Sequence, residues 1–135
     1  MTDLDDISHE LGISPAWREE LGSCWLAAPG LDPRALAHAM LARRARFVTI
    51  TAIEQPNAEL RLDYHWDLDG PLLTFTLATE SHQIPSITEL CPGADWVERE
   101  IHDYFAVDFL GRDLEPLMLC ADDKPGFHLR NGRSQ

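Results

Sequence analysis

The sequence predicts an α+β fold in which a four-stranded, mainly antiparallel sheet is packed with helices. Three observations lead to this prediction. Leu60–Asp67 alternates apolar and polar side chains, Asp69-Gly70 is a dipeptide typical of hairpin turns, and Asp32-Pro33 is typical of a helix start. The alternation predicts a sheet with one face buried and the other in water.

Three further segments complete the predicted sheet. The apolar run Ser23–Ala28 is short and ends at a Pro-Gly pair, which favours a strand over a helix. Phe47–Ile53 is rich in β-branched residues, which suit strands. After the turn, every second residue from Leu73 to Leu77 is apolar and continues the buried face.

Two helices are predicted in the first third of the chain. Residues 3–11 carry apolar side chains at helical spacing. A second helix begins at Asp32 and runs to about Arg44, and it buries Leu36, Met40 and Leu41. The arginines at its end either suit the negative pole of the helix dipole or form a basic patch: Arg43, Arg44 and Arg46.

Ser86–Phe105, with the sequence SITELCPGADWVEREIHDYF, reads as a two-segment helix broken at Pro92-Gly93. Ser86 and Glu89 have the spacing of a capping box, in which each side chain satisfies a free backbone N–H at a helix start. Pro92 ends the first segment because it lacks an N–H and disfavours helix at the preceding residue. Gly93 is the expected N-cap of the second segment.

The second segment of this helix has one apolar and one charged face. The apolar face comprises Val97, Ile101, Tyr104 and Phe105. The charged face comprises Asp95, Glu98, Arg99, His102 and Asp103. Glu100 lies beside the apolar face, where a carboxylate needs a partner. We expect the apolar face to pack in the chain's own core and the charged face to be available to another molecule.

The composition excludes several classes of protein. A net charge of −12 argues against direct binding to nucleic acid or to an anionic membrane surface. Three cysteines without a C-x-x-C pair argue against a disulfide framework and against a four-thiolate iron–sulfur centre. No apolar run approaches the roughly 18 residues of a membrane span, and the acidic N-terminus is unlike a signal peptide. We expect one domain over residues 1–110 and an extended C-terminal tail over 111–135.

Three motifs in the Ser86–Phe105 region and just before it point to a known family. The segments PSITEL, PGADW and EREIHDYF, between Pro85 and Phe105, closely resemble the signature of the 30 kDa subunit family of respiratory-chain NADH dehydrogenase, known as complex I. That family includes the equivalent small subunit of membrane-bound, energy-converting nickel–iron hydrogenases. The resemblance is dense over about twenty residues, which makes it far more specific than a lone short motif.

The resemblance implies a hydrophilic subunit with no active site, no cofactor and no metal of its own. It would sit in the peripheral arm of a membrane-bound NADH:quinone oxidoreductase or a related hydrogenase complex, on the cytoplasmic face of the cell membrane. There it would brace the large subunit of the quinone or nickel–iron site, beside iron–sulfur subunits, during electron transfer coupled to ion translocation. It would reach the membrane only through those partners. The implied partner interface comprises Trp96, Glu98, Arg99, Glu100, His102, Asp103 and Arg112.

The chain departs from the family pattern after Phe105. Family members usually continue with Phe-Gly and then with Gly-His-Pro and a pair of arginines. Here Ala106 follows Phe105, and Arg112 follows Gly111. A Leu-Glu-Pro-Leu sequence at residues 114–117 and the short tail resemble the hydrogenase branch, and an NADH dehydrogenase subunit stays open as the other branch.

Two other functions stay open on the residues alone. One is a stand-alone metal-dependent enzyme built on Glu98, His102 and Asp103, which a helix brings to one side. A metal site usually recruits three or four ligands, and a charged helix face explains the same residues. The other is a free-standing assembly or regulatory module that uses the same fold.

Overall fold

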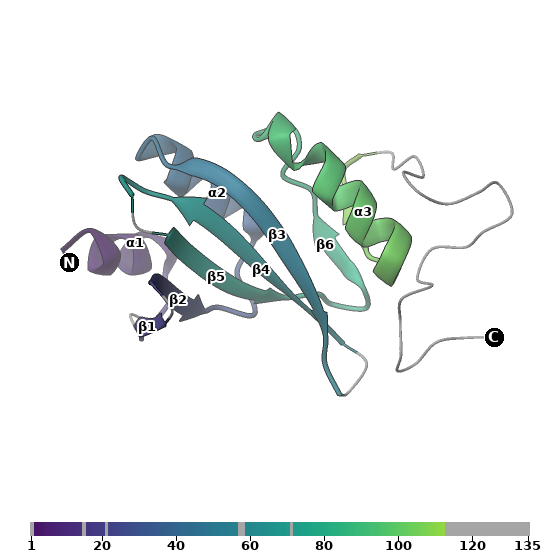
Figure 1. The fold of residues 1–135 in the computed structure, drawn as a ribbon, viewed down its shortest axis with the longest axis horizontal. Coiled ribbons are helices and arrows are strands. Elements are labelled where there is room, and N and C mark those ends of the chain that lie inside the picture. Colours follow the sequence, from purple (N-terminus) through teal and green to yellow (C-terminus); the bar gives the residue numbers. More distant parts are fainter. Residues whose placement is uncertain (1, 15, 21, 57–58, 71, 113–135) are drawn as a thin grey trace, which may run out of the picture.

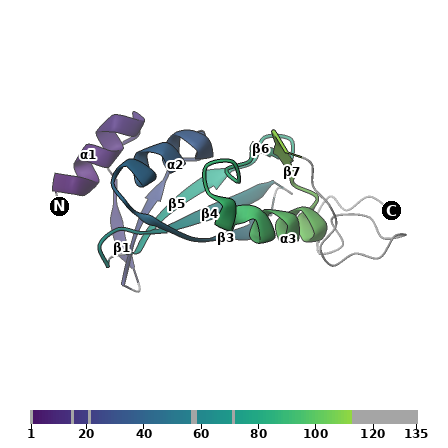
Figure 2. The ribbon, with the colours of Figure 1, turned by 90° about the horizontal axis from the view of Figure 1, so that it is seen from above.

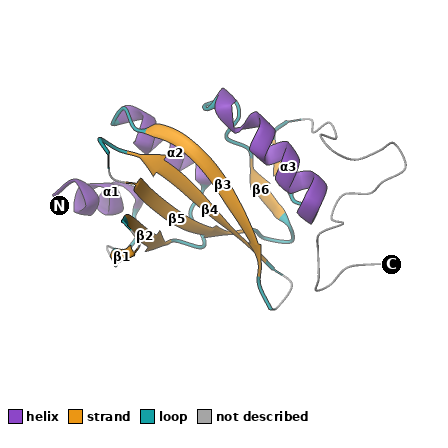
Figure 3. Cartoon of the chain, viewed as in Figure 1, coloured by secondary structure: helices purple, strands orange, loops and turns teal. Residues whose placement is uncertain are grey.

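A computed structural model describes residues 2–14, 16–20, 22–56, 59–70 and 72–112 of the chain. Figures 1 and 3 show a twisted sheet with helices, in the α+β arrangement that the sequence predicts. The elements in chain order are α1 (Thr2–Leu11), β1 (Arg18–Glu20), β2 (Ser23–Ala27), α2 (Pro33–Ala42), β3 (Arg46–Glu54), β4 (Leu60–Asp67), β5 (Leu72–Ala78), β6 (Gln83–Pro85), a 3-10 turn η1 (Pro92–Ala94), α3 (Asp95–Phe105) and β7 (Asp108–Leu110).

The main sheet has five strands in the order β1-β2-β5-β4-β3. The pairs β3–β4, β4–β5 and β1–β2 are antiparallel, and only β2–β5 is parallel. The prediction of a mainly antiparallel α+β sheet is confirmed, and the sheet gains β1, a three-residue strand too short to give a periodic signal. β6 and β7 form a second, two-stranded parallel sheet.

One face of the main sheet forms the core. Leu60, Leu62, Tyr64 and Trp66 on β4 are fully buried, as the alternation predicts, and Phe75 on β5 lies opposite Tyr64 in the strand register. Figure 2 shows α1 and α2 on the same side of the sheet. Trp17 packs edge-on against Phe75 and donates its indole N–H to Ser8 of α1, so α1 covers this face.

The other face of the sheet is polar but only partly exposed. Asp63 is fully buried, and Arg61 lies 3.1 Å from it. His65 sits between Thr51 and Thr74, at 3.0 and 2.8 Å. Burial lowers the pKa of His65, with Asp63 acting in the opposite direction. The sequence predicts a solvated face here, and this is wrong for Asp63 because neighbouring side chains cover it.

The start of α2 follows its sequence signals closely. The Asp32 side chain accepts from the N–H of Arg34 at 2.9 Å, and Pro33 occupies the first turn. Leu36 and Met40 are buried, whereas Leu41 is 40% exposed and lies outside the core. Two of the arginines after α2 pair with acids of other elements: Arg43 with Glu10 of α1 at 2.8 Å and Arg46 with Asp67 of β4 at 2.7 Å.

The first half of the Ser86–Phe105 region is not a helix. Ser86 accepts from the N–H of Thr88, which makes a tight turn, and Glu89 pairs with Arg34 instead of capping Ser86. The predicted capping box is therefore wrong, because Glu89 finds a cationic partner on α2. In the second half, Gly93 lies inside η1, and Ala94 takes the N-cap position without a side-chain cap.

No helix within the described ranges is both long enough and apolar enough to cross a membrane. Residues 113–135, which make up most of the predicted tail and include the Leu-Glu-Pro-Leu sequence at 114–117, lie outside the described residues.

Candidate functional site

Helix α3 is fixed in place at both ends. It runs beside the edge strand β3 (Figure 1), and both α3 and the preceding turn η1 contact this strand. Ile101 is buried and packs in the core, while Val97, Tyr104 and Phe105 are half-buried. The helix ends at Ala106, whose φ of 58° is left-handed and whose N–H donates to the carbonyl of His102 at 3.0 Å.

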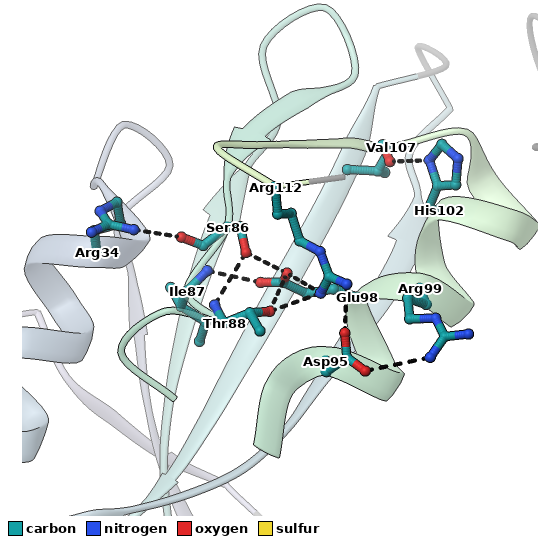
Figure 4. Close-up of polar contacts among 10 residues, drawn as sticks. All are labelled: Arg34, Ser86, Ile87, Thr88, Asp95, Glu98, Arg99, His102, Val107 and Arg112. Carbon is teal, nitrogen blue, oxygen red and sulfur yellow. Dashed lines mark hydrogen bonds and ion pairs between the residues drawn. The ribbon is translucent and has the colours of Figure 1, made fainter. Parts of the chain in front are cut away.

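Glu98 is a fully buried charge on α3, with no exposed surface. Its carboxylate accepts from the Ser86 hydroxyl at 2.6 Å, the Thr88 hydroxyl at 2.8 Å and the backbone N–H of Ile87 at 2.9 Å. These groups all come from the turn that precedes η1 (Figure 4). These donors satisfy both oxygens of a carboxylate that has no contact with water.

Arg112 completes this group from the chain after β7. Its guanidinium donates to the Thr88 hydroxyl at 2.9 Å, lies 3.4 Å from Glu98 and donates to Asp95 through its other terminal nitrogen. Figure 4 shows this guanidinium between Asp95 and Glu98. We call Ser86, Ile87, Thr88, Asp95, Glu98 and Arg112 the Glu98 cluster. It joins three segments that are separate in the sequence.

The cluster changes the acidity of the groups around it. The hydrogen bond from Arg112 is the main cause that lowers the pKa of Asp95, and Arg99 adds to it. Burial raises the pKa of Tyr64 well above its ordinary value and also raises the pKa of Cys91, and the negative charge of Glu98 acts in the same direction on both. Cys91 is thus a buried thiol whose surroundings disfavour the thiolate.

Arg34 connects the cluster to α2. Its guanidinium donates to the carbonyl of Ser86 at 3.2 Å and to Glu89 at 2.8 Å. The turn that supplies three donors to Glu98 is thus held from its other side as well. This contact spans 52 residues of sequence, so neither local periodicity nor local capping rules predict it.

The exposed part of α3 lies beside this cluster. Trp96 is 67% exposed, the largest exposed fraction of any large apolar side chain among the described residues. The guanidinium of Arg99 lies 5.6 Å from the centre of its ring, and the same guanidinium pairs with Asp95 at 3.4 Å. Glu100 is also exposed, so it needs none of the partners that the helical wheel suggests. We call Trp96, Arg99 and Glu100 the Trp96 surface.

The charged face predicted for α3 is therefore split. Glu98 and Asp103 are buried, so an exposed position is wrong for these two; the side chain of Arg112, which lies outside α3, is 16% exposed. The ring of His102 is also largely covered, and its Nδ1 lies 2.8 Å from the carbonyl of Val107. Side chains of this kind need internal partners when buried, and the sequence does not show which partners are close.

The metal-site alternative finds no support in this geometry. In the described part of the chain, no three His, Cys, Asp or Glu side chains gather closely enough to hold a metal ion. The carboxylate of Glu98 is engaged by the turn at residues 86–88.

The residues that receive Glu98 are not predicted by the sequence patterns. Ser86 is expected as a helix N-cap, and Thr88 receives no role. The one local signal is the hydroxyl at every second position, Ser86 and Thr88, which places two donors on one side of an extended turn.

Comparison with known families identifies the fold and its relatives. The family model described as respiratory-chain NADH dehydrogenase, 30 Kd subunit, matches residues 33–132. The C subunit of NADH-quinone oxidoreductase from Rhodopseudomonas palustris (strain BisB18) is 37% identical over 76 residues, which cover 50% of this chain and 38% of that protein. The mitochondrial NADH-ubiquinone oxidoreductase 30.4 kDa subunit of Neurospora crassa is 32% identical over 110 residues, which cover 76% of this chain. The chain spans 38% of the length of each of these relatives.

Two solved structures share the fold. The trypsin-resistant fragment of Nqo5 has a TM-score of 0.64 at 19% identity and matches 84% of this chain and 97% of its own. A chain of the archaeal membrane-bound sulfane sulfur reductase, a respiratory membrane complex, has a TM-score of 0.68 at 19% identity and matches 95% of this chain and 82% of its own. The family match covers well over half of the sequence and includes α2, the sheet strands β3 to β5 and the whole Glu98 cluster. The chain belongs to the family of the respiratory-chain NADH dehydrogenase 30 kDa subunit.

Proposed function

We propose that this protein is a non-catalytic peripheral-arm subunit of a membrane-bound NADH:quinone oxidoreductase, or of a related energy-converting respiratory complex. In this role it braces the large catalytic subunit while electron transfer drives proton or ion translocation. Family membership and the names of the relatives support the proposal. It acts from the cytoplasmic side of the membrane, beside iron–sulfur subunits, and reaches the membrane through its partners.

One observation gives this proposal a physical site: an exposed tryptophan lies at the start of α3, which the Glu98 cluster holds in place. Trp96 projects from the first turn of α3, and the neighbouring Glu98 and Asp95 are tied to Arg112. Tryptophan and arginine are the residues that contribute most to binding at protein interfaces. Because the helix is already ordered, little conformational entropy is lost when a partner covers the ring.

The Trp96 surface is the part of the implied interface that a partner can reach in the free chain. Trp96 supplies apolar area, and the guanidinium of Arg99 lies 5.6 Å from the centre of its ring, so a cation stands beside the exposed indole. Glu98 and Arg112 take part indirectly, because they hold the helix that carries this surface.

The test is association with the large subunit of the same complex. We expect the full chain to co-purify with that subunit, and Trp96→Ala to weaken the association about tenfold or more. Leu41→Ala is the matched control, because it removes an exposed apolar side chain from α2. Equal association of the Trp96→Ala variant and the parent chain would exclude this surface, and a parent chain that never associates would contradict the proposed function itself.

Arg99→Ala sharpens the same test. The substitution removes a cation without touching the core, so we expect a folded chain with weaker association. The loss should be smaller at high salt, because screening weakens the contribution of a charge at the rim of an interface. Circular dichroism of the variant, alongside the association assay, separates a binding effect from unfolding.

A further inference from the structure

The polar face of the main sheet carries a groove that the proposed function does not use. It consists of two adjoining cavities that share Ala27, Arg61 and Thr76. The first has a volume of about 280 Å³ and is lined by Ala16, Arg18, Trp25, Ala27, Arg61 and Thr76. The strand register places Trp25, Ala27, Thr76 and Arg61 on the side of the sheet opposite to Leu26, Phe75 and Leu62.

The first cavity offers hydrogen-bond donors and no carboxylate among its described lining residues. Arg18 and Arg61 bring guanidinium groups, each of which pairs through one nitrogen with an acid of its own strand, Glu20 at 3.4 Å and Asp63 at 3.1 Å. Trp25 adds an indole N–H and Thr76 a hydroxyl. This is unusual in a chain with 23 acidic and 11 basic residues. A ligand that fits this lining must bring acceptors, and a carboxylate fits the fork of an arginine best.

Two donors in this cavity have no acceptor within the described structure. The indole N–H of Trp25 and the Nε–H of Arg61 are both buried and unpaired. A terminal nitrogen of Arg61 is held by Asp63 at 3.1 Å, which fixes the direction of the guanidinium. Arg18 lies 5.7 Å from the ring centre of Trp25, opposite it on the paired strand β1. The donors are thus positioned by the sheet itself.

The second cavity is more apolar and lies further along the same strands. Its volume is about 350 Å³, and to the shared residues its lining adds Pro29, Leu60, Leu77 and Ala78 together with Gln55, Glu59 and Thr79. In β2 and the residues just after it, Trp25 and Ala27 line the first cavity, and Ala27 and Pro29 line the second. The two cavities are therefore displaced by two residues along the chain. Two residues of an extended chain span about 6–7 Å. The step therefore equals the separation between side chains i and i+2 of an extended peptide.

We propose that this groove binds an extended segment of a partner polypeptide, with an acidic side chain in the first cavity and an apolar side chain two residues away in the second. The carboxylate accepts from Arg18 and Arg61, and the apolar side chain covers Ala27 and Ala78. This surface is separate from the Trp96 surface on α3, so it can be tested whether or not the proposed function holds.

The test is a titration of the full chain with short capped peptides, followed by ¹H–¹⁵N NMR. The probe is acetyl-Gly-Glu-Thr-Leu-Gly-amide, and the matched probes replace Glu by Gln or Leu by Ser. We expect saturable shifts of the Trp25 indole N–H and of the Ala27 and Thr76 amides at millimolar peptide. The Gln probe should bind about tenfold more weakly, since it loses a charge-assisted hydrogen bond.

Variants of the chain locate the binding. Arg18→Gln and Arg61→Gln should each weaken binding of the Glu probe severalfold. Arg46→Gln, which removes the same charge from the same face outside the groove, should leave it unchanged. Arg18 is exposed, so that variant stays folded even if loss of the Arg61–Asp63 pair destabilises the other.

Several results would overturn the proposal. They are the absence of a saturable shift, equal affinity for the Glu and Gln probes, or Arg18→Gln and Arg61→Gln variants that bind like the parent chain. Glutarate that binds as tightly as the peptide would overturn the assignment to a polypeptide, because a free dicarboxylate cannot use the second cavity in the same way.

Discussion

The Glu98 cluster and the Trp96 surface are neighbours on one helix but differ in how their groups are satisfied. Glu98 lies fully inside, and its bonds run to Ser86, Ile87, Thr88 and Arg112 of the same chain. Trp96, two residues earlier, is mostly exposed. The difference indicates that the two residues have separate roles: the buried charge of Glu98 holds the helix, and the exposed ring of Trp96 is left for a partner.

The largest expected effect follows from removing the buried carboxylate. Glu98→Ala leaves two hydroxyls and one backbone N–H without their acceptor and removes one of the two carboxylates beside Arg112, so we expect a loss of about 3–5 kcal/mol in the free energy of unfolding. Urea denaturation measures it. Glu100→Ala is the control, since that exposed carboxylate should change stability by less than about 0.5 kcal/mol. Equal effects of the two substitutions would contradict the comparison.

Removing the cation of the cluster should have a smaller effect. Arg112→Gln leaves Glu98 with three donors from the turn at residues 86–88, so we expect a loss of about 1–3 kcal/mol. The same urea experiment measures this change. A loss larger than that of Glu98→Ala would mean that Arg112, and not the turn, is the main support of the carboxylate.

The end of α3 offers a substitution that should stabilise the chain. Ala106 has a left-handed φ of 58°, a conformation that costs an L-residue with a Cβ roughly 1–2 kcal/mol. Glycine avoids this strain but loses more entropy on folding, so we expect Ala106→Gly to add about 0.5–1 kcal/mol. Thermal unfolding checks this, and Ala106→Val, which is more strained, should shift the midpoint in the opposite direction.

The smallest effect concerns acid. The pKa of Asp95 is lowered in the folded chain, so its contribution to stability is fully present above the ordinary pKa of about 4 and is lost as the pH falls through the lowered value. We expect Asp95→Asn to lower stability at neutral pH and to flatten the fall in acid. The free energy of unfolding of the two proteins, measured from pH 7 downwards, should converge at low pH, and parallel curves would exclude this role.

Much of the fold could be predicted from local patterns. The alternation of Leu60–Asp67 predicts the central strand β4, and the Asp32-Pro33 start predicts α2. β1, β6 and β7 could not be predicted in this way, because each has three residues and depends on a partner strand. Strands of that length carry no period of their own.

The candidate site could be predicted only in part. The motif around Trp96 and Arg99 marks the correct helix, and Trp96 is exposed. The inward direction of Glu98 could not be predicted, because a carboxylate enters a core only where distant groups receive it. Those groups lie 10 to 14 residues away, at Thr88, Ser86 and Arg112. A helical wheel places Glu98 correctly around the axis but does not show what faces it.

The parallel pairing of β2 with β5 has a consequence for how the chain is made. β2 ends at Ala27, and its partner β5 begins only at Leu72, after α2, β3 and β4 have been synthesised. During translation the N-terminal segment therefore emerges well before the strand that it joins. We expect the local hairpins to form first and the first strands to add last, so a chaperone that protects nascent chains would meet the apolar side of β2 before its partner strand exists.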